Sequence, residues 1–341
     1  MSDKMTASER FRAVLDFSPT DRLPLIEWAP YWDKTKERWE KEGMPAGMDN
    51  EAIQRYFNLD VVLQNWVAPL SAGGAAHKTE GELVSNEADY EKLLEEGRLF
   101  SDEQLNTDIL NRWAEWDRKR RERGDSILML TFLGFFWFPR TLFGIEPHFY
   151  AFYDHPELMH RMNRDLVEYN LKCLERFCGI AKPDFVTFAE DMSYNNGPML
   201  SENLFDEFML PYYKMLVPRL KELDIKIIID SDGDITECAG WFRRAGADGM
   251  LPLERQAGVD INILREKYPD MCWIGAYDKM VMNRGETAIR NEFERLMPVA
   301  EQGGLIISCD HQTPPGVSLE QYRCYLKYFR EYAAKRDLSP L

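Results

Sequence analysis

Several side chains that could do chemistry lie where short apolar runs of the sequence end. Glu190 and Asp191 end one run, Asp230 ends a second run shortly before Asp232, and His311 follows a third. Groups placed just past the strands of a parallel barrel point into its mouth. Carboxyls and an imidazole that share a cleft can transfer protons. We therefore predict that Glu190, Asp230 and His311 are catalytic.

The same groups also raise the question of a metal ion. Carboxyls that converge in a partly desolvated cleft must be neutralised by a proton, a metal or a cationic ligand. Asp230, Asp232 and His311 form a candidate metal site, and mixed Asp and His ligation suits zinc or another divalent ion. The spacing matches no specific metal motif, and no HExxH sequence occurs. For His311, three roles stay open: general acid, metal ligand, or a paired loop histidine.

Aromatic side chains gather at the same positions along the chain. Indole and phenyl rings with few polar groups among them would form the wall of a pocket for an aromatic or flat ligand, although some of the rings must be ordinary core. Arg140 offers one cation in this set, and Asp278 offers a further carboxyl. The residues predicted to bind substrate are Trp28, Tyr31, Trp66, Trp137, Arg140, Tyr194 and Asp278.

Eight short β-rich runs carry these residues and alternate with amphipathic helical stretches. This alternation is typical of a parallel sheet covered by helices. We predict an α/β fold, a (β/α)₈ TIM barrel that spans residues 1–341 as a single domain, although an open doubly wound sheet gives the same pattern. The segment 68–125 is too long for a simple connection, so it predicts a helical insertion after the second strand. The predicted strands are 22–28, 60–66, 126–131, 184–190, 225–230, 249–253, 272–277 and 305–309.

Composition excludes several classes of function. The formal net charge of -16, from 58 acidic and 42 basic residues, repels nucleic acid and anionic membrane surfaces. No apolar run reaches the ~20 residues that span a bilayer, and no secretory signal is evident, so we expect a cytoplasmic protein. The six cysteines show no CxxC spacing, and the nucleotide-binding and serine-hydrolase motifs are missing. The oligomeric state stays open, with a homodimer as one option.

Several stretches of the sequence resemble the uroporphyrinogen decarboxylase-like superfamily, and within it the branch of cobamide-dependent methyltransferases. The resemblance covers nearly the whole chain and is carried by TDRLPLIEWAPYWD, FAEDMSYNNGPMLSENLFDEF, IIIDSDGDI and DHQTPPGVSLEQY. It implies a (β/α)₈ barrel. It also implies one of two activities, namely porphyrinogen side-chain decarboxylation or methyl transfer between a substrate and a corrinoid protein.

The sequence departs from both of these patterns. Decarboxylases of the family carry an RQAGRY segment after the first strand, whereas this chain reads EWAPYWD, and an arginine-poor mouth suits a polyanionic substrate badly. The thiol-methylating branch has a zinc triad of His-x-Cys and Cys, and the matching positions here are Asp230, Asp232 and His311. The remaining pattern is similar to methyltransferase I of the aryl methyl ether O-demethylases of anaerobic bacteria.

The resemblance therefore implies a specific reaction. A methoxylated aromatic of the guaiacol, veratrole or vanillate type would lie against Trp28, Trp66 and Trp137. Its methyl group would pass to cobalamin in the cob(I) state, carried by a separate corrinoid protein or supplied free. A phenolate leaves poorly, so His311 with Asp230, or a metal such as zinc that they bind, would activate the ether oxygen. The alternatives are a porphyrinogen decarboxylase and a tetrapyrrole-binding module without turnover.

Overall fold

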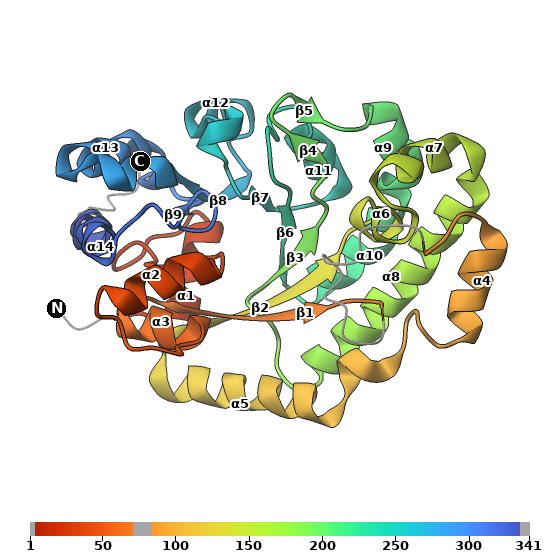
Figure 1. Cartoon of the computed structure of the whole chain (residues 1–341), viewed down its shortest axis with the longest axis horizontal. Coiled ribbons are helices and arrows are strands. Elements are labelled where there is room, and N and C mark those ends of the chain that lie inside the picture. Colours follow the sequence, from red (N-terminus) through yellow and green to blue (C-terminus); the bar gives the residue numbers. More distant parts are fainter. Residues whose placement is uncertain (1–3, 71–82, 335–341) are drawn as a thin grey trace.

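The computed structural model describes residues 4–70 and 83–334, and its centre is one sheet of parallel strands (Figure 1). Seven strands pair in chain order, each parallel to the next. Strand β2 is buried along its whole length, as expected where helices cover a parallel sheet. The strands are β1 (Val61–Val67), β2 (Ser126–Leu133), β3 (Phe185–Ala189), β6 (Lys226–Asp230), β7 (Gly249–Leu251), β8 (Cys272–Tyr277) and β9 (Leu305–Cys309).

Helices follow the strands and pack on the outside of the sheet. α13 packs on β8 and β9, α10 packs on β6, and α5 packs along β2 (Figure 1). A short hairpin of β4 (Ser193–Tyr194) and β5 (Gly197–Pro198) follows β3. The helices are α1 (Ala7–Leu15), α2 (Asp33–Lys41), α3 (Asn50–Tyr56), α4 (Glu87–Glu95), α5 (Thr107–Arg123), α6 (Trp137–Phe143), α7 (Ile145–Asp154), α8 (Pro156–Cys178), α9 (Glu202–Phe208), α10 (Leu210–Glu222), α11 (Ala239–Ala245), α12 (Ile261–Lys267), α13 (Glu286–Ala300) and α14 (Leu319–Ala334), with 3₁₀ turns η1 (Asp102–Leu105), η2 (Arg255–Ala257) and η3 (Lys279–Arg284).

The predicted insertion is confirmed: α4, η1 and α5 all lie between β1 and β2. Part of its sequence, which includes His77, falls outside the described residues. No helix in the ranges 4–70 and 83–334 is both long and apolar enough to cross a membrane.

The prediction of a strand at residues 22–28 was wrong, because this segment forms no strand ladder. On one side, the Asp60 amide donates to the Leu25 carbonyl at 2.8 Å. On the other side, the Ser308 hydroxyl donates to Glu27 at 2.8 Å. The segment therefore joins β1 to β9 largely through side chains. Pro24 lacks an N–H group, which weakens any ladder at this position.

The interior core shows that this segment nevertheless completes the barrel. One cluster of buried hydrophobic residues takes a side chain from the segment and from each of the seven strands. Phe11 and Val14 of α1 belong to the same cluster, so α1 closes one end of the barrel. The predicted barrel class is thus confirmed, with one position held by an extended segment. The eight contributors are Ile26, Val62, Met129, Phe185, Ile228, Leu251, Ile274 and Ile306.

Candidate active site

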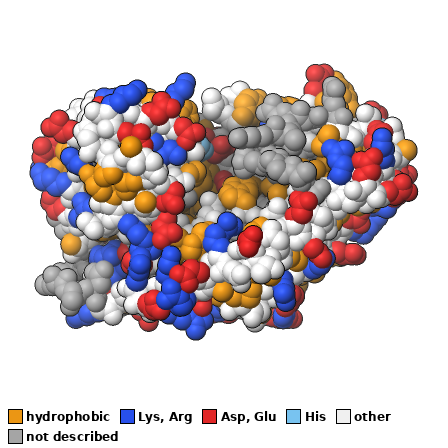
Figure 2. All heavy atoms as spheres, turned by 60° about the horizontal axis from the view of Figure 1, so that its bottom comes forward, with side chains coloured by type: hydrophobic (Ala, Val, Ile, Leu, Met, Phe, Trp, Pro, Cys, Tyr) orange, Lys and Arg blue, Asp and Glu red, His pale blue; other side chains and the backbone are white. Residues whose placement is uncertain are grey.

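A cavity of about 400 Å³ opens at the C-terminal ends of the strands. Six of the residues predicted from the sequence line it: Trp28, Trp66, Trp137, Asp230, Asp232 and His311. In the space-filling view, acidic side chains and a histidine are visible in a hollow of the surface that hydrophobic side chains border (Figure 2). Barrel enzymes carry their reactive groups at this end, so the cavity is the candidate active site.

The ends of β3 and β6 place the acidic groups side by side. The backbone carbonyl of Asp230 accepts from the Glu190 amide at 2.8 Å and from the Asp191 amide at 3.2 Å. Asp191 has a φ of 45°, an unusual conformation for a residue other than glycine, and its side chain lines the cavity. Such strained residues are often found at functional sites. Two carboxyls from neighbouring strands thus face one cavity.

Burial and like charges raise the pKa values of the carboxyls in this cluster. Burial raises the pKa of Asp230 well above its usual range, and the charges of Asp232, Asp191 and Glu254 raise it further. Burial raises the pKa of Asp232 to about 7, with Asp191 and Glu254 adding to the effect and Lys279 opposing it. Among the described residues, none forms a hydrogen bond with the Asp230 carboxyl, although it is adjacent to the cavity. The Asp230 carboxyl is therefore available to a ligand, and its raised pKa favours the protonated form, which can donate a hydrogen bond.

His311 stands next to both the aromatic wall and the acids. Its ring meets that of Trp28 edge to face, with 5.8 Å between centroids, and its Nε2 lies 3.6 Å from Oδ1 of Asp232. Burial lowers the pKa of His311, while Glu254 raises it. One ligand atom each from Asp232, Glu254 and His311 lies within 4.8 Å of the others. This group could hold a divalent cation, with Glu254 in the place that we predicted for Asp230.

Glu190 does not open into the cavity, contrary to the expectation from its place at a strand end. It is fully buried, and its carboxylate accepts from the amides of Phe135 at 2.9 Å and Phe136 at 2.7 Å, and from the Tyr213 hydroxyl. Burial raises the pKa of Glu190 to about 7. The carboxyl therefore anchors the chain that leads into α6 and so helps to place Trp137.

Three other predicted residues also lie outside the cavity lining. Tyr31 is buried, and its hydroxyl lies 2.9 Å from that of Tyr322. Tyr194 is exposed on the β4–β5 hairpin. Asp278 caps η3 and accepts from Gln256 at 2.7 Å. None of these three side chains is part of the cavity lining.

Arg140 packs against Trp137, one of the aromatic residues that line the cavity. Its guanidinium lies 4.7 Å from the centre of the Trp137 ring and donates to the Asp191 carbonyl at 3.1 Å. Lys279, which sequence reasoning missed, brings a second cation: its Nζ lies 3.2 Å from Asp310 and 3.7 Å from Glu254. The acidic cluster is thus partly balanced by two cations that do not line the cavity.

The alternation of side chains along the strands could have sharpened the prediction. Ala189 and Asp191 line the cavity, whereas Glu190 between them does not. Gln64 and Trp66, which are two residues apart in β1, likewise both line it. Successive side chains of a strand point to opposite faces, so only every second residue at a strand end can reach the cavity. Gln64 and Gln312, which also line it, were missed because we considered only charged and aromatic residues.

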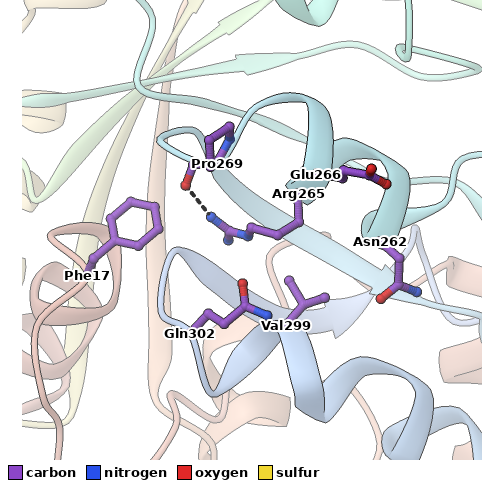
Figure 3. Close-up of a pocket in the computed structure, with 7 residues that line it drawn as sticks. All are labelled: Phe17, Asn262, Arg265, Glu266, Pro269, Val299 and Gln302. Carbon is purple, nitrogen blue, oxygen red and sulfur yellow. Dashed lines mark hydrogen bonds between the residues drawn. The ribbon is translucent and has the colours of Figure 1, made fainter. Parts of the chain in front are cut away.

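A second cavity, of about 430 Å³, lies at the other end of the barrel (Figure 3). Its lining includes Phe17 and Arg265. The Arg265 guanidinium donates to the carbonyls of Pro269 and Gly303, each at 2.9 Å, and lies over the Phe17 ring at 5.1 Å. These contacts join the chain before β8 to the chain before β9, which is a structural role.

Comparisons with known proteins agree with this architecture. A model of the family "Uroporphyrinogen decarboxylase (URO-D)" matches residues 143–332. Among solved structures, a methyltransferase from Methanosarcina mazei is similar, with a TM-score of 0.70 and 14% identity over 96% of this chain and 99% of that chain. An intracellular xylanase from Thermoanaerobacterium saccharolyticum aligns at 10% identity over 88% of each chain, with a TM-score of 0.41 that is too low to argue from. No curated protein matches the chain.

Proposed function

Because the chain belongs to the uroporphyrinogen decarboxylase family, we propose that it is a cobamide-dependent methyltransferase of that family's barrel type. Its reaction is the transfer of a methyl group from a small methoxylated aromatic to cob(I)alamin, presented by a separate corrinoid protein or supplied free. The observation that carries the proposal is a cavity that combines three indole walls with carboxyls whose pKa values burial raises.

The cavity suits a single aromatic ring in size and in chemistry. Its volume of about 400 Å³ lies within the usual range for small-molecule sites. Trp28, Trp66 and Trp137 provide flat apolar surface, while Gln64 and Gln312 can orient polar substituents of the ring. A methoxy group on a ring held by the indoles is open to attack from the mouth of the barrel.

Methyl transfer requires that the ether oxygen leave as a neutral phenol. The acceptor attacks the methyl carbon, the carbon–oxygen bond breaks, and its electron pair goes to the oxygen together with a proton. Asp230 is suited to donate that proton, because burial raises the pKa of its carboxyl well above the usual range and the carboxyl lines the cavity. Asp230 then recovers a proton from solvent, and His311 beside Asp232 is suited to relay it.

Zinc fits the neighbouring group of Asp232, Glu254 and His311, since two carboxylate oxygens and an imidazole nitrogen are suitable ligands. When bound, the ion would polarise the ether oxygen as a Lewis acid. Metal analysis of the purified protein, together with the variant Glu254→Gln, tests this fit. A stoichiometric ion in the wild type that is lost from the variant supports it, and a metal-free active enzyme contradicts it.

The family match also favours a second candidate, decarboxylation of a porphyrinogen. The lining of the cavity argues against it. Among the described lining residues there is no lysine or arginine, whereas Asp191, Asp230 and Asp232 are acidic. The carboxylates of a porphyrinogen would find no cation to pair with in this lining.

One pair of assays separates the two functions. The enzyme is incubated with guaiacol, veratrole or vanillate and cob(I)alamin, and the absorbance change to methylcobalamin is followed. In parallel, consumption of uroporphyrinogen is measured. We expect methylcobalamin from at least one aryl ether, no consumption of uroporphyrinogen, and loss of methyl transfer in His311→Ala. Decarboxylation without methyl transfer would reverse the assignment.

A further inference from the structure

The candidate active site is larger than one cavity. A further cavity of about 370 Å³ adjoins it, and the two share Trp28, Trp66 and Gln64 in their linings, together with Ala29 and Pro30. From these shared residues, the further cavity extends over β1 towards α3 and α5, where it reaches Glu51 and Trp116. We call this extension the far lobe. The two cavities meet at two indoles and form one bent site.

The far lobe differs from the near cavity in its polar groups. Asp49 caps α3 by accepting from the Ala52 amide at 2.8 Å, and Glu51 pairs with Arg55 at 2.9 Å. Both carboxylates line the lobe, and no lysine or arginine does so among the described residues. With Trp116, the lobe therefore combines aromatic surface with negative charge.

The two nearby arginines, Arg55 and Arg112, already have partners within the protein. Arg55, besides its contact with Glu51, pairs with Asp125 at 2.5 Å. Arg112 lies over the Trp116 ring at 5.3 Å and donates to Asn65 at 2.8 Å. Neither arginine is part of the lining, so a ligand in the lobe meets carboxylates and indoles first.

We propose that the far lobe binds a cationic substituent of the methyl donor, an ammonium group on a short alkyl chain. This inference rests on the proposed function, because it narrows the donor to aryl methyl ethers that carry an amine. Indole faces attract an ammonium ion, and they do so most strongly where it is partly desolvated. The carboxylates of Asp49 and Glu51 also attract an ammonium ion, and they would repel a carboxylate in its place.

A matched series of four ligands tests the charge preference. Homoveratrylamine, ethylveratrole and homoveratrate place a cation, no charge and an anion on nearly the same frame, and veratrole lacks the side chain. Dissociation constants come from quenching of tryptophan fluorescence, without any corrinoid present. We expect homoveratrylamine to bind about tenfold more tightly than homoveratrate, with ethylveratrole between them. Equal affinity for cation and anion would overturn the proposal.

Two variants locate the preference in the far lobe. Glu51→Gln should reduce the advantage of homoveratrylamine over ethylveratrole by about threefold and leave veratrole unchanged. Trp116→Leu should weaken homoveratrylamine and ethylveratrole but not veratrole. Glu115→Gln is the matched control, because Glu115 is adjacent in α5, pairs with Arg118 at 2.6 Å, and does not line either cavity. If the variants affect all four ligands equally, the far lobe is not where the substituent binds.

The same ligands separate this inference from the proposed function. Methylcobalamin formed from veratrole, without any effect of the side chain's charge, would sustain the methyltransferase and reject the far-lobe assignment. A charge preference in binding without methyl transfer from any ligand would sustain the lobe and reject the reaction.

Discussion

The two ends of the barrel hold cavities of nearly equal size and opposite character. The cavity at the C-terminal ends measures about 400 Å³, and the one beside Arg265 measures about 430 Å³. In the first, burial raises the pKa of Asp230 well above its usual range, and the Asp230 carboxyl forms no hydrogen bond with any described residue. In the second, Arg265 donates to the carbonyls of Pro269, Met271 and Gly303.

This difference shows that volume does not identify a functional site in this molecule. The terminal nitrogens of Arg265 bond to backbone carbonyls and so stabilise the fold, whereas the Asp230 carboxyl, which lines a cavity without such a partner, is available to a ligand. Substitution of Asp230, the carboxyl without a described partner, should therefore change activity and leave stability alone. Substitutions at the other end should do the reverse.

The largest effect is expected for Asp230→Asn. The amide cannot donate an acidic proton, so the turnover number for methyl transfer should fall by about 10²- to 10⁴-fold. Removing a carboxyl from a cluster of like charges relieves repulsion, so the melting temperature should not fall. Turnover is measured as methylcobalamin formation and folding by thermal melting. A variant with wild-type turnover would remove Asp230 from the mechanism.

Arg265→Met should give the opposite result. It leaves three carbonyl groups without their donor in a buried place, which should lower the free energy of unfolding by about 3 kcal/mol. Because the cavity beside it takes no part in the reaction, turnover per folded molecule should stay within about twofold. Denaturant unfolding and active-site titration separate the two quantities. Loss of turnover without loss of stability would contradict the distinction between the two ends.

Most of the scaffold could be predicted from the sequence, because short apolar runs that alternate with helical stretches identify buried parallel strands. Each predicted strand from 60–66 onward overlaps an observed one. The segment 22–28 differed because its residues Leu25 and Glu27 bond to the side chains of Asp60 and Ser308, which lie far away in the chain. Contacts between side chains distant in sequence leave no periodic signal.

The site was predicted in part for a related physical reason. Strand ends of a barrel converge, so Asp230, Asp232 and His311 could be placed together without knowing any contact. Whether a given side chain faces the cavity depends on strand alternation and on nearby amides, and the amides of Phe135 and Phe136 bind Glu190 away from it. The orientation of Glu190 therefore depends on the conformation of the turn after β2, which could not be predicted from the sequence.

Substitution of Glu190 should have an effect of intermediate size, on the pH dependence of the free energy of unfolding. Its pKa rises from 4.5 to about 7 on folding, so the folded chain holds the proton more tightly than the unfolded chain. The free energy of unfolding should therefore fall as pH rises from about 4.5 to about 7, by up to about 3 kcal/mol from this group, and then level off. Glu190→Gln cannot titrate and should flatten that slope. The control Glu207→Gln, at an exposed position of α9, should keep the slope, and an unchanged slope in Glu190→Gln would refute the assignment.

The smallest effect is expected for Ser308→Ala, which probes how the segment 22–28 holds one wall of the site. The Ser308 hydroxyl donates to Glu27 at 2.8 Å and accepts from the Trp28 amide at 3.3 Å. Loss of these bonds should cost about 1 kcal/mol of stability. Because Trp28 lines the cavity, KM for the aryl ether should rise about threefold while kcat changes little.

A matched variant separates this positioning role from simple destabilisation. Ser126→Ala also removes a buried hydroxyl, but Ser126 lies at the start of β2, in a regular ladder with Val61, and its hydroxyl donates to Asp125 at 3.1 Å. It should lower stability by a similar amount and leave KM unchanged. If both variants raise KM equally, then the segment does not position Trp28. The contrast between the two ends of the barrel would then rest on the acidic cluster alone.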